Sequence, residues 1–361
     1  MEANQGSRQY KTLVQHYKQY QRHYSGCAHA GRAVAAEQGW LQLLPGVACF
    51  VLDEPAEPTE PEAAFVDLMV HLSHPDSVVF DRGLSRFTAC LGHFDSPDEP
   101  WGFAVRTAIQ HLLPGLSPEL AQALLDQAVN VPGAVHLWSQ FQWPEAQCGQ
   151  GGIEWHIERS ALEALYCHHN AELILSLPDE QMTAPLVQAL GIAAHLTPNV
   201  ALSRLDTLLD RFPEAVCSAY WLAASRDATG QLLEALQRPH LAAIAEPYWA
   251  LYSGQNLAWD PSMGVLGNPP HSGAAMPDYD SAVQWWQGSP AHNVPLWRGA
   301  PLTDTELSQV LGRHWGTHTA PLWAWWQYQQ RRYMADPLTQ WHYSRLIALG
   351  LSPLEAAGAP E

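Results

Sequence analysis

ALGIAAH at residues 189–195 and AYWLAAS at residues 219–225 stand 30 residues apart, and a second segment with leucines at helical spacing follows each of them. The second segments are ALSRLDTLLDRF at 201–212 and GQLLEALQ at 230–237. A small, apolar first helix and a leucine-rich second helix cannot bury their apolar faces alone, so stacked neighbours would build one continuous core. The pattern predicts a row of helical pairs, that is, a HEAT-like α-solenoid.

Two further segments extend this spacing in both directions. ALEALYCHHN at 161–170 begins 28 residues before the first of the two segments, and PYWALYSG at 247–254 places Trp249 28 residues after Trp221. We therefore expect HEAT-like helical repeats over residues 151–254. A helical domain without repeats is the alternative, because the repeat is degenerate.

The N-terminal region has helical signals as well. Apolar residues recur at helical spacing in EPEAAFVDLMVHL (60–72), WGFAVRTAIQHLL (101–113) and SPELAQALLDQAV (117–129). GVACFVL at 46–52 is consistent with a strand, a buried loop or a helix. The sequence thus predicts an all-α protein whose first region, residues 1–150, is irregular and mainly helical.

Tryptophan is concentrated in the C-terminal region, residues 255–361. Eleven of the sixteen tryptophans lie between Trp221 and Trp341. Helical signals return after a loop-rich stretch, and Thr303 with Glu306 matches a capping box at a helix start. We expect this region to form a Trp-rich helical cap that covers the apolar end of the last repeat.

The charge distribution restricts the classes of partner. The chain has 36 acidic residues against 18 lysines and arginines, for a formal net charge of −18. Residues 33–105 hold twelve acidic and two basic residues, including the run DEPAEPTEPE at 53–62. Such a negative field repels nucleic acid and anionic lipid and attracts a basic protein, although acidity can also serve solubility alone. We therefore expect a basic protein partner, and neither nucleic acid nor membrane.

Other sequence features indicate a soluble, cytoplasmic protein. The sequence contains no run of about 18 or more apolar residues, so it predicts no transmembrane helix. Residues 1–20 lack the apolar core of a secretory signal. The six cysteines are irregularly spaced and include no CxxC pair, which favours reduced thiols over a disulfide framework.

Common motifs for zinc hydrolysis, serine hydrolysis and phosphate binding are absent from the sequence, whereas cysteine–histidine catalysis has no local signature that would reveal or exclude it. The 18 histidines include no HExxH pair, and the consecutive Cys167, His168 and His169 would point in different directions on a helix. GxSxG and GxxxxGK[ST] are absent too. We therefore predict a protein that is not an enzyme and that needs no metal or cofactor, with a metal-dependent enzyme as the least favoured alternative.

Two pairs of adjacent tryptophans, Trp285-Trp286 and Trp325-Trp326, suggest packing or recognition. Neighbours on a helix face about 100° apart, so we expect one ring of each pair to point inward and the other toward the rim. Core packing is the leading interpretation, because a buried indole contributes a large apolar area. Partner docking and a cation or sugar cage are the alternatives.

The C-terminal half resembles a family of bacterial HEAT-like-repeat proteins. AIAEPYWALYSGQNL (243–257), MPDYDSAVQWWQGSP (276–290) and PLWRGAPLTDTELSQVL (295–311) are similar to that family's glycine-ended repeat, its Pro-Asp…Ala-Val…Trp-Trp helix and its "RYLxGxPLT" segment. The matching residues are Gly254, Trp285, Trp286, Gly299, Pro301, Leu302 and Thr303. The resemblance covers roughly residues 160–340 and carries packing residues without a catalytic signature.

Members of that family are encoded in type VI secretion clusters, near spike proteins, adaptors and toxins. The resemblance therefore implies a protein-binding accessory of interbacterial toxin delivery. We expect a cytoplasmic immunity protein that neutralises a cognate toxin. A nuclease with a basic cleft is a suitable toxin, because an acidic binder can compete there with the nucleic-acid backbone. An adaptor or chaperone that loads a toxin onto the secretion spike is the alternative.

The candidate partner contacts are acidic residues of the N-terminal region. They are Asp53, Glu54, Glu57, Glu60, Glu62, Asp95, Asp98 and Glu99. A curved solenoid could bury the roughly 1,600 Å² that a stable protein–protein interface needs. For any one of these residues, a solvated acidic loop is the alternative interpretation.

Overall fold

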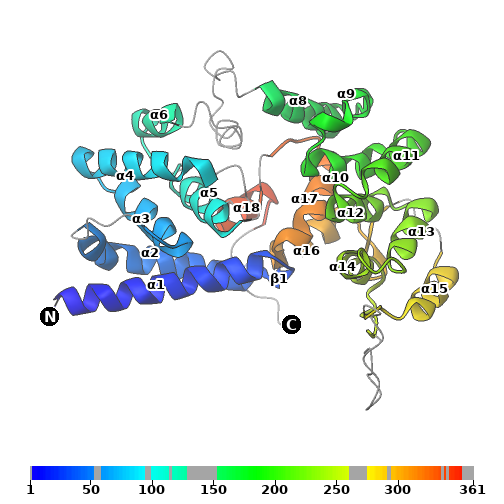
Figure 1. Cartoon of the computed structure of the whole chain (residues 1–361), viewed down its shortest axis with the longest axis horizontal. Helices are drawn as coiled ribbons and strands as arrows, with labels where there is room; N and C mark the ends of the chain where they lie inside the picture. Colours follow the sequence, from blue (N-terminus) through cyan, green and yellow to red (C-terminus); the bar gives the residue numbers. More distant parts are fainter. Residues whose placement is uncertain are drawn as a thin grey trace. The chain divides into compact units, whose positions relative to one another are not determined.

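The protein is mostly α-helical, as the sequence predicts (Figure 1). The computed structural model describes residues 2–52, 58–93, 99–113, 116–127, 153–259, 275–290, 294–334, 337–338 and 341–351. Within these residues, each β-strand is only two residues long and pairs with one other strand. No helix in this part of the chain has both the length and the apolar character that a membrane span requires.

The chain divides into two compact units. The first unit comprises Met1–Ile157, Ser308–Ala320 and Met334–Glu361, and the second comprises Glu158–Leu307 and Pro321–Tyr333. Residues of the predicted C-terminal region occur in both units.

The first unit contains a helical bundle in which α1 packs along α2, and α3 packs against α4 and α5. Its elements are α1 (Glu2–Tyr24), β1 (Ala28–His29), α2 (Ala30–Leu52), α3 (Pro61–Leu72), α4 (Ser77–Cys90), η1 (Leu91–His93), α5 (Pro100–Leu112), α6 (Pro118–Gln127), β4 (His314–Trp315), η7 (Thr317–Thr319) and α18 (His342–Ala348). The segment at 46–52, for which the sequence left three possibilities, is the last part of α2.

Aromatic side chains fill the core of this bundle. Tyr17 of α1 stacks on Phe65 of α3 with 4.3 Å between ring centroids, and Trp40 of α2 lies 4.8 Å from the same ring. All three side chains are inaccessible to solvent. Burial of such large rings stabilises the bundle by a few kcal/mol per residue, in the range of about 1.5–3 for a large side chain.

The second unit is built mainly from short helices (Figure 1). Its elements are α8 (Ile153–His168), which begins in the first unit, α9 (Glu172–Ser176), η6 (Asp179–Gln181), α10 (Ala184–Ala193), α11 (Pro198–Leu208), α12 (Pro213–Ala223), α13 (Arg226–Ala235), α14 (Ala242–Ser253), α15 (Tyr279–Gly288), β2 (Leu296–Trp297), β3 (Ala300–Pro301) and α17 (Ala320–Gln329); α16 (Asp304–Arg313) has residues in both units.

The packing of the second unit follows the spacing seen in the sequence. Helix α12 packs between α10 and α14, while α11 packs on α10 and α12, and α13 packs on α12 and α14. The approach of α10 to α12 is close, because a β-carbon at Gly191 would lie 2.8 Å from the α-carbon of Ala219. Only glycine at this position leaves room for the neighbouring backbone.

Proline and left-handed residues keep these helices short. Helices α10, α11 and α12 each have a proline in their first turn, where a missing N–H costs no hydrogen bond. Helices α12 and α14 end at Ala224 and Gly254, which have φ angles of 53° and 77°. A left-handed residue at this position stops the helix and turns the chain.

Candidate functional site

The structure describes only three of the acidic residues that the sequence nominates as partner contacts. Glu60 and Glu99 are exposed and occupy the N-cap positions of α3 and α5, without a side-chain cap hydrogen bond. Glu62 is half-buried, and its carboxylate lies 3.6 Å from the ammonium group of Lys18. The other candidates, Asp53, Glu54, Glu57, Asp95 and Asp98, lie outside the described residues.

A second set of acidic residues lies in the second unit, on and next to α11 and α13. Asp206 and Asp210 belong to α11 and the turn after it, and Asp227 and Glu234 belong to α13; all four are exposed. Asp206 accepts a hydrogen bond of 2.6 Å from Tyr220, which fixes its carboxylate. Sequence reasoning missed this set. The polar faces of the two leucine-rich segments at 201–212 and 230–237 carried the signal.

The residues Gly254, Trp285, Gly299, Pro301, Leu302 and Thr303, on which the expected resemblance depends, lie in the second unit, around the end of α14. The backbone N–H groups of Arg298 and Gly299 donate to the carbonyls of Leu251 and Tyr252 at 2.7 and 2.8 Å, respectively. These bonds dock the β2–β3 hairpin onto the helix end. Gly299 has a φ of 84°, and a β-carbon there would lie 3.1 Å from the Ser253 carbonyl oxygen. The contact therefore favours glycine on both conformational and steric grounds.

The remaining residues of this motif stabilise the same block. Pro301 pairs with Leu296 in the hairpin, and the N–H of Leu302 donates to the carbonyl of Pro295 at 3.0 Å. Thr303 and Glu306 form the predicted capping box, because each side chain accepts a hydrogen bond from the other residue's backbone N–H, at 3.3 and 3.0 Å. The motif thus consists of packing and capping residues.

The two rings of the Trp285-Trp286 pair have different partners, and both are half-buried. Trp285 meets Trp249 and Tyr252 of α14 edge-on, at centroid distances of 5.7 and 5.6 Å. Trp286 instead contacts residues at the start of α13. The two rings therefore pack against different helices, and both border solvent.

The expectation of one inward and one outward ring is wrong for Trp325-Trp326. Both side chains are buried, with 3% and 4% of their surface exposed. Trp325 faces His195 at a centroid distance of 4.9 Å, and Trp326 meets Trp323 at 5.5 Å. Helix α17 is apolar around most of its circumference, so two different faces of the helix are covered.

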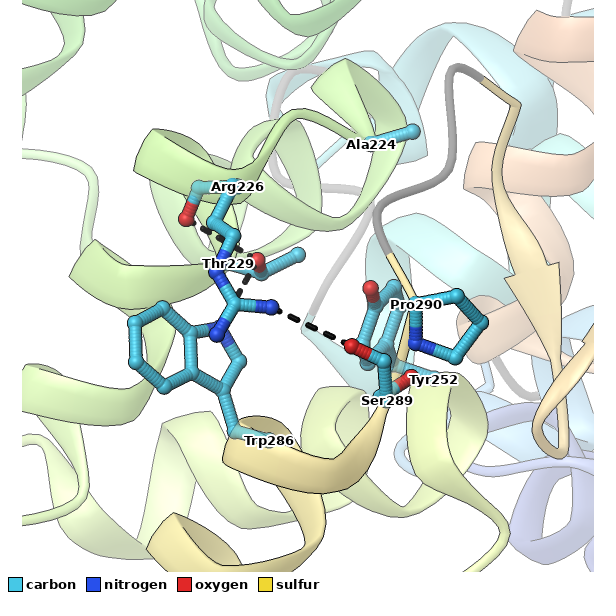
Figure 2. Close-up of a pocket in the computed structure, with 7 residues that line it drawn as sticks. All are labelled: Ala224, Arg226, Thr229, Tyr252, Trp286, Ser289 and Pro290. Atoms are coloured by element: carbon cyan, nitrogen blue, oxygen red, sulfur yellow. Dashed lines mark hydrogen bonds between the residues drawn. The ribbon is translucent and has the colours of Figure 1, made fainter.

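Trp286 forms one wall of a small pocket at the start of α13 (Figure 2). The guanidinium carbon of Arg226 lies 4.0 Å from the centroid of the Trp286 ring, which is a cation–π contact. Arg226 Nη1 donates to the carbonyl oxygen of Ser289 at 3.2 Å, and Trp286 Nε1 donates to Thr229 Oγ1 at 3.3 Å. The arginine is therefore held from two sides, although its side chain is exposed.

The other pocket residues make the floor polar but uncharged. Thr229 is buried, and its hydroxyl donates toward the carbonyls of Ser225 and Arg226 at 3.0 and 3.1 Å. Burial raises the pKa of Tyr252, while the Thr229 hydrogen bond and the Arg226 charge oppose that rise. Tyr252 therefore remains a neutral hydroxyl, and Arg226 is the charged group of the pocket. Ala224 and Pro290 complete the lining.

A buried polar cluster lies in the first unit. Glu37 of α2 is 5% exposed and accepts hydrogen bonds of 3.0 and 3.2 Å from the backbone N–H of His342. Arg345 Nη2 and His111 Nε2 lie 3.8 and 3.7 Å from the Glu37 carboxylate. Burial first, and then the charges of Arg345 and His29, lower the pKa of His342 to about 3. These contacts tie α18 to α2 and α5, which gives the cluster a structural role.

The described residues of the two units were compared with the requirements of a metal site and of a reactive thiol. Among the residues placed by the structure, no three His, Cys, Asp or Glu side chains lie close enough to hold a metal ion. Cys167 and Cys217 are not part of a disulfide. Burial raises the pKa of both Cys167 and Cys217, to about 12 for Cys217, so neither thiol is activated as a nucleophile.

Comparisons with protein-family models, curated proteins and solved structures give no match to this chain. The geometry of the second unit, the exposed acidic residues and the Arg226 pocket are therefore the features that bear on function.

Proposed function

We propose that this chain is a protein-binding accessory of interbacterial toxin delivery, and specifically a cytoplasmic immunity protein that binds and neutralises a cognate toxin. The observation that carries the proposal is the packing of the second unit. Helices α10, α12 and α14 pack one against the next, and the intervening α11 and α13 expose acidic side chains. Such packing supports the proposal, because the helical pairs of a HEAT-like solenoid stack in a row and present one face to a partner.

The block around Trp285 supports a capping role. A row of helical pairs leaves the apolar side of its last pair uncovered. Trp285 covers Trp249 on the last described repeat helix, α14, and Trp221 Nε1 donates to the carbonyl of Leu296 in the hairpin at 2.9 Å. We therefore assign α15 and the β2–β3 hairpin to the Trp-rich cap.

Charge favours a basic partner. With a net charge of −18, the chain would attract a basic protein and speed its diffusional encounter. Opposite charges can raise association rates to about 10⁸–10⁹ M⁻¹ s⁻¹ at low salt. A nuclease toxin fits, because its active-site cleft must be positive to hold the nucleic-acid backbone. The resemblance of residues 160–340 to proteins encoded near toxins is consistent with this role.

Co-expression tests the proposal. The bound protein is first captured from the native cell and identified by mass, and its toxic domain is then expressed in a host without a secretion apparatus. We expect this chain to restore growth and to form a complex with the purified domain. If the chain changes only the secretion of the toxin and leaves growth inhibited, the adaptor is the correct function. If it neither binds nor protects, a toxin-directed role is excluded.

A further inference from the structure

Arg226 is a fixed cation whose charge is not neutralised by any described carboxylate. A guanidinium group has five N–H donors. Among the described residues, the guanidinium group of Arg226 donates one hydrogen bond, from Nη1 to the carbonyl of Ser289, which leaves most of its donors for a ligand. This is unusual on a chain of net charge −18, where exposed acidic residues are abundant.

The contacts of Arg226 prepare it for recognition. An exposed arginine normally loses conformational freedom when it binds a ligand, which weakens binding. Here the Trp286 ring supports the guanidinium plane, and the Ser289 carbonyl fixes one of its nitrogens (Figure 2). Trp286 is fixed in turn, because its Nε1 donates to the buried Thr229. Part of the conformational entropy of the Arg226 side chain is therefore already lost before a ligand binds.

The pocket is sized for a single functional group. Its cavity volume is about 10 Å³, room for about one water-sized group, against the roughly 300–1,000 Å³ of typical small-molecule and cofactor sites. A planar guanidinium pairs best with planar anions that accept two hydrogen bonds. One arginine within a strongly negative chain is better matched to a singly charged carboxylate than to a phosphate dianion. The N-terminal end of the α13 dipole, at Arg226, adds to this attraction.

We infer that the pocket formed by Arg226, Trp286 and Tyr252 binds one carboxylate group of the protein partner, from an acidic side chain or a chain terminus. The identity of the carrier rests on the proposed function, but the chemistry of the pocket does not. The acidic faces draw in a basic partner, and the Arg226 pocket then selects a partner that places a carboxylate at this point. Attraction and selection thus reside at different residues.

The first test uses small probes and the protein alone. The indole ¹H–¹⁵N signal of Trp286 is assigned by its loss in Trp286→Phe, and is then followed during titration with N-acetylalanine, N-acetylglutamic α-amide and neutral N-acetylalaninamide. We expect saturable shifts with the carboxylates, with a Kd of about 1–10 mM, and none with the neutral amide. Arg226→Gln should abolish the shift. Arg238→Gln, which removes an exposed arginine just beyond the same helix, should preserve it.

Each remaining outcome decides against the inference. A shift that is equal for the neutral amide, that persists in Arg226→Gln, or that saturates at lower concentration with inorganic phosphate would exclude a carboxylate pocket. The carboxylate probe with the lower Kd identifies the source, which is a chain terminus for N-acetylalanine and an acidic side chain for N-acetylglutamic α-amide.

A second test keeps this inference apart from the proposed function. With the captured partner, Arg226→Gln should raise the Kd at least about tenfold, mainly through faster dissociation. If the partner binds and protects but Arg226→Gln has no effect, the carboxylate pocket is wrong and the immunity function stands. If the probes bind as expected but no toxin is neutralised, the pocket stands and the immunity function is wrong.

Discussion

At the scale of single residues, Gly191 shows the closest backbone approach among the described glycines of the second unit. A β-carbon there would overlap the carbonyl of Ala219 on α12. Both groups are backbone-fixed, so a rotamer change cannot relieve the overlap. We predict that Gly191→Ala lowers the free energy of unfolding by about 1–3 kcal/mol, the usual effect of overpacking. Urea unfolding followed by circular dichroism measures the difference.

Gly230 provides the matched control. It lies within α13, and a β-carbon there would meet only the Trp286 ring at 3.8 Å, which is an ordinary contact. Gly230→Ala should therefore raise the free energy of unfolding by about 0.5–1 kcal/mol, because alanine favours the helix. Equal effects of the two substitutions would contradict the close approach of α10 and α12.

His342 makes the first unit sensitive to acid. Its pKa is lowered to about 3, chiefly by burial, from an ordinary value of 6.5. The folded protein therefore keeps this histidine neutral, while the unfolded chain takes up a proton below about pH 6.5. The stability that the folded protein gains by keeping His342 neutral is fully present above pH 6.5 and is lost as the pH falls below it. At pH 5 the loss amounts to about 2 kcal/mol.

We predict that His342→Gln removes this part of the acid sensitivity. The hydrogen bonds to Glu37 come from the backbone N–H of residue 342, so the substitution leaves them in place. The free energy of unfolding is measured at pH 7.5 and at pH 5 for both proteins. The decrease between the two pH values should be about 2 kcal/mol smaller in the variant than in the natural protein. His93→Gln, at an exposed position, should leave the difference unchanged. An unchanged difference in His342→Gln as well would refute the assignment.

At the scale of elements, helix ends were more predictable than tertiary contacts. The Thr303–Glu306 capping box acts within a few residues, so the sequence alone predicts it. The segment at 46–52 was undecided because a short apolar run fits a strand or a buried helix equally well. It lies in α2, whose buried residues pack in the aromatic core of the first unit. Tertiary context, which periodicity does not contain, decides such cases.

The ends of α12 and α14 allow a test of the repeat. Ala224 and Gly254 both adopt left-handed conformations, at C-cap positions 30 residues apart. We predict that Gly254→Ala lowers the free energy of unfolding by about 1–3 kcal/mol, because it adds left-handed strain and brings a β-carbon 3.0 Å from the Arg298 carbonyl oxygen. Chemical denaturation of the variants provides the measurement.

The reverse substitution, Ala224→Gly, should have an effect near zero. Relief of the left-handed strain is worth about 1 kcal/mol, while removal of a buried methyl group costs about 0.8 kcal/mol. A large loss in Ala224→Gly, or none in Gly254→Ala, would show that the two helix ends are not equivalent.

At the scale of the whole molecule, the sequence predicted the helical class and the acidity but not the charged pocket. Arg226 and Trp286 lie 60 residues apart, and Ser289 reaches the arginine through its backbone carbonyl. No spacing rule joins such residues. The Trp285-Trp286 motif drew attention to one wall of the pocket, whereas the other wall depends on how α15 packs against α13. Sequence patterns reveal faces of helices, and contacts between distant helices require coordinates.

The acidic surface of α11 and α13 gives the last prediction. Asp210, Asp227 and Glu234 are exposed, and no ion pair is recorded for them among the described residues. We predict that Asp210→Asn, Asp227→Asn and Glu234→Gln together slow association with the proposed basic partner about tenfold at low salt. At about 1 M salt, where the Debye length is about 3 Å, the difference should nearly vanish. Stopped-flow association at several salt concentrations measures both effects.

Two comparison variants make this result specific. Arg238→Gln removes an exposed positive charge, so it should leave association unchanged or make it faster. Glu60→Gln with Glu99→Gln alters the exposed acidic residues of the N-terminal region instead. A larger effect of that pair would place the partner on the first unit. If the association rate changes neither with salt concentration nor with any of these substitutions, electrostatic attraction has no part in binding. A negative field affects the encounter rate only through the protein's charges and their screening by salt.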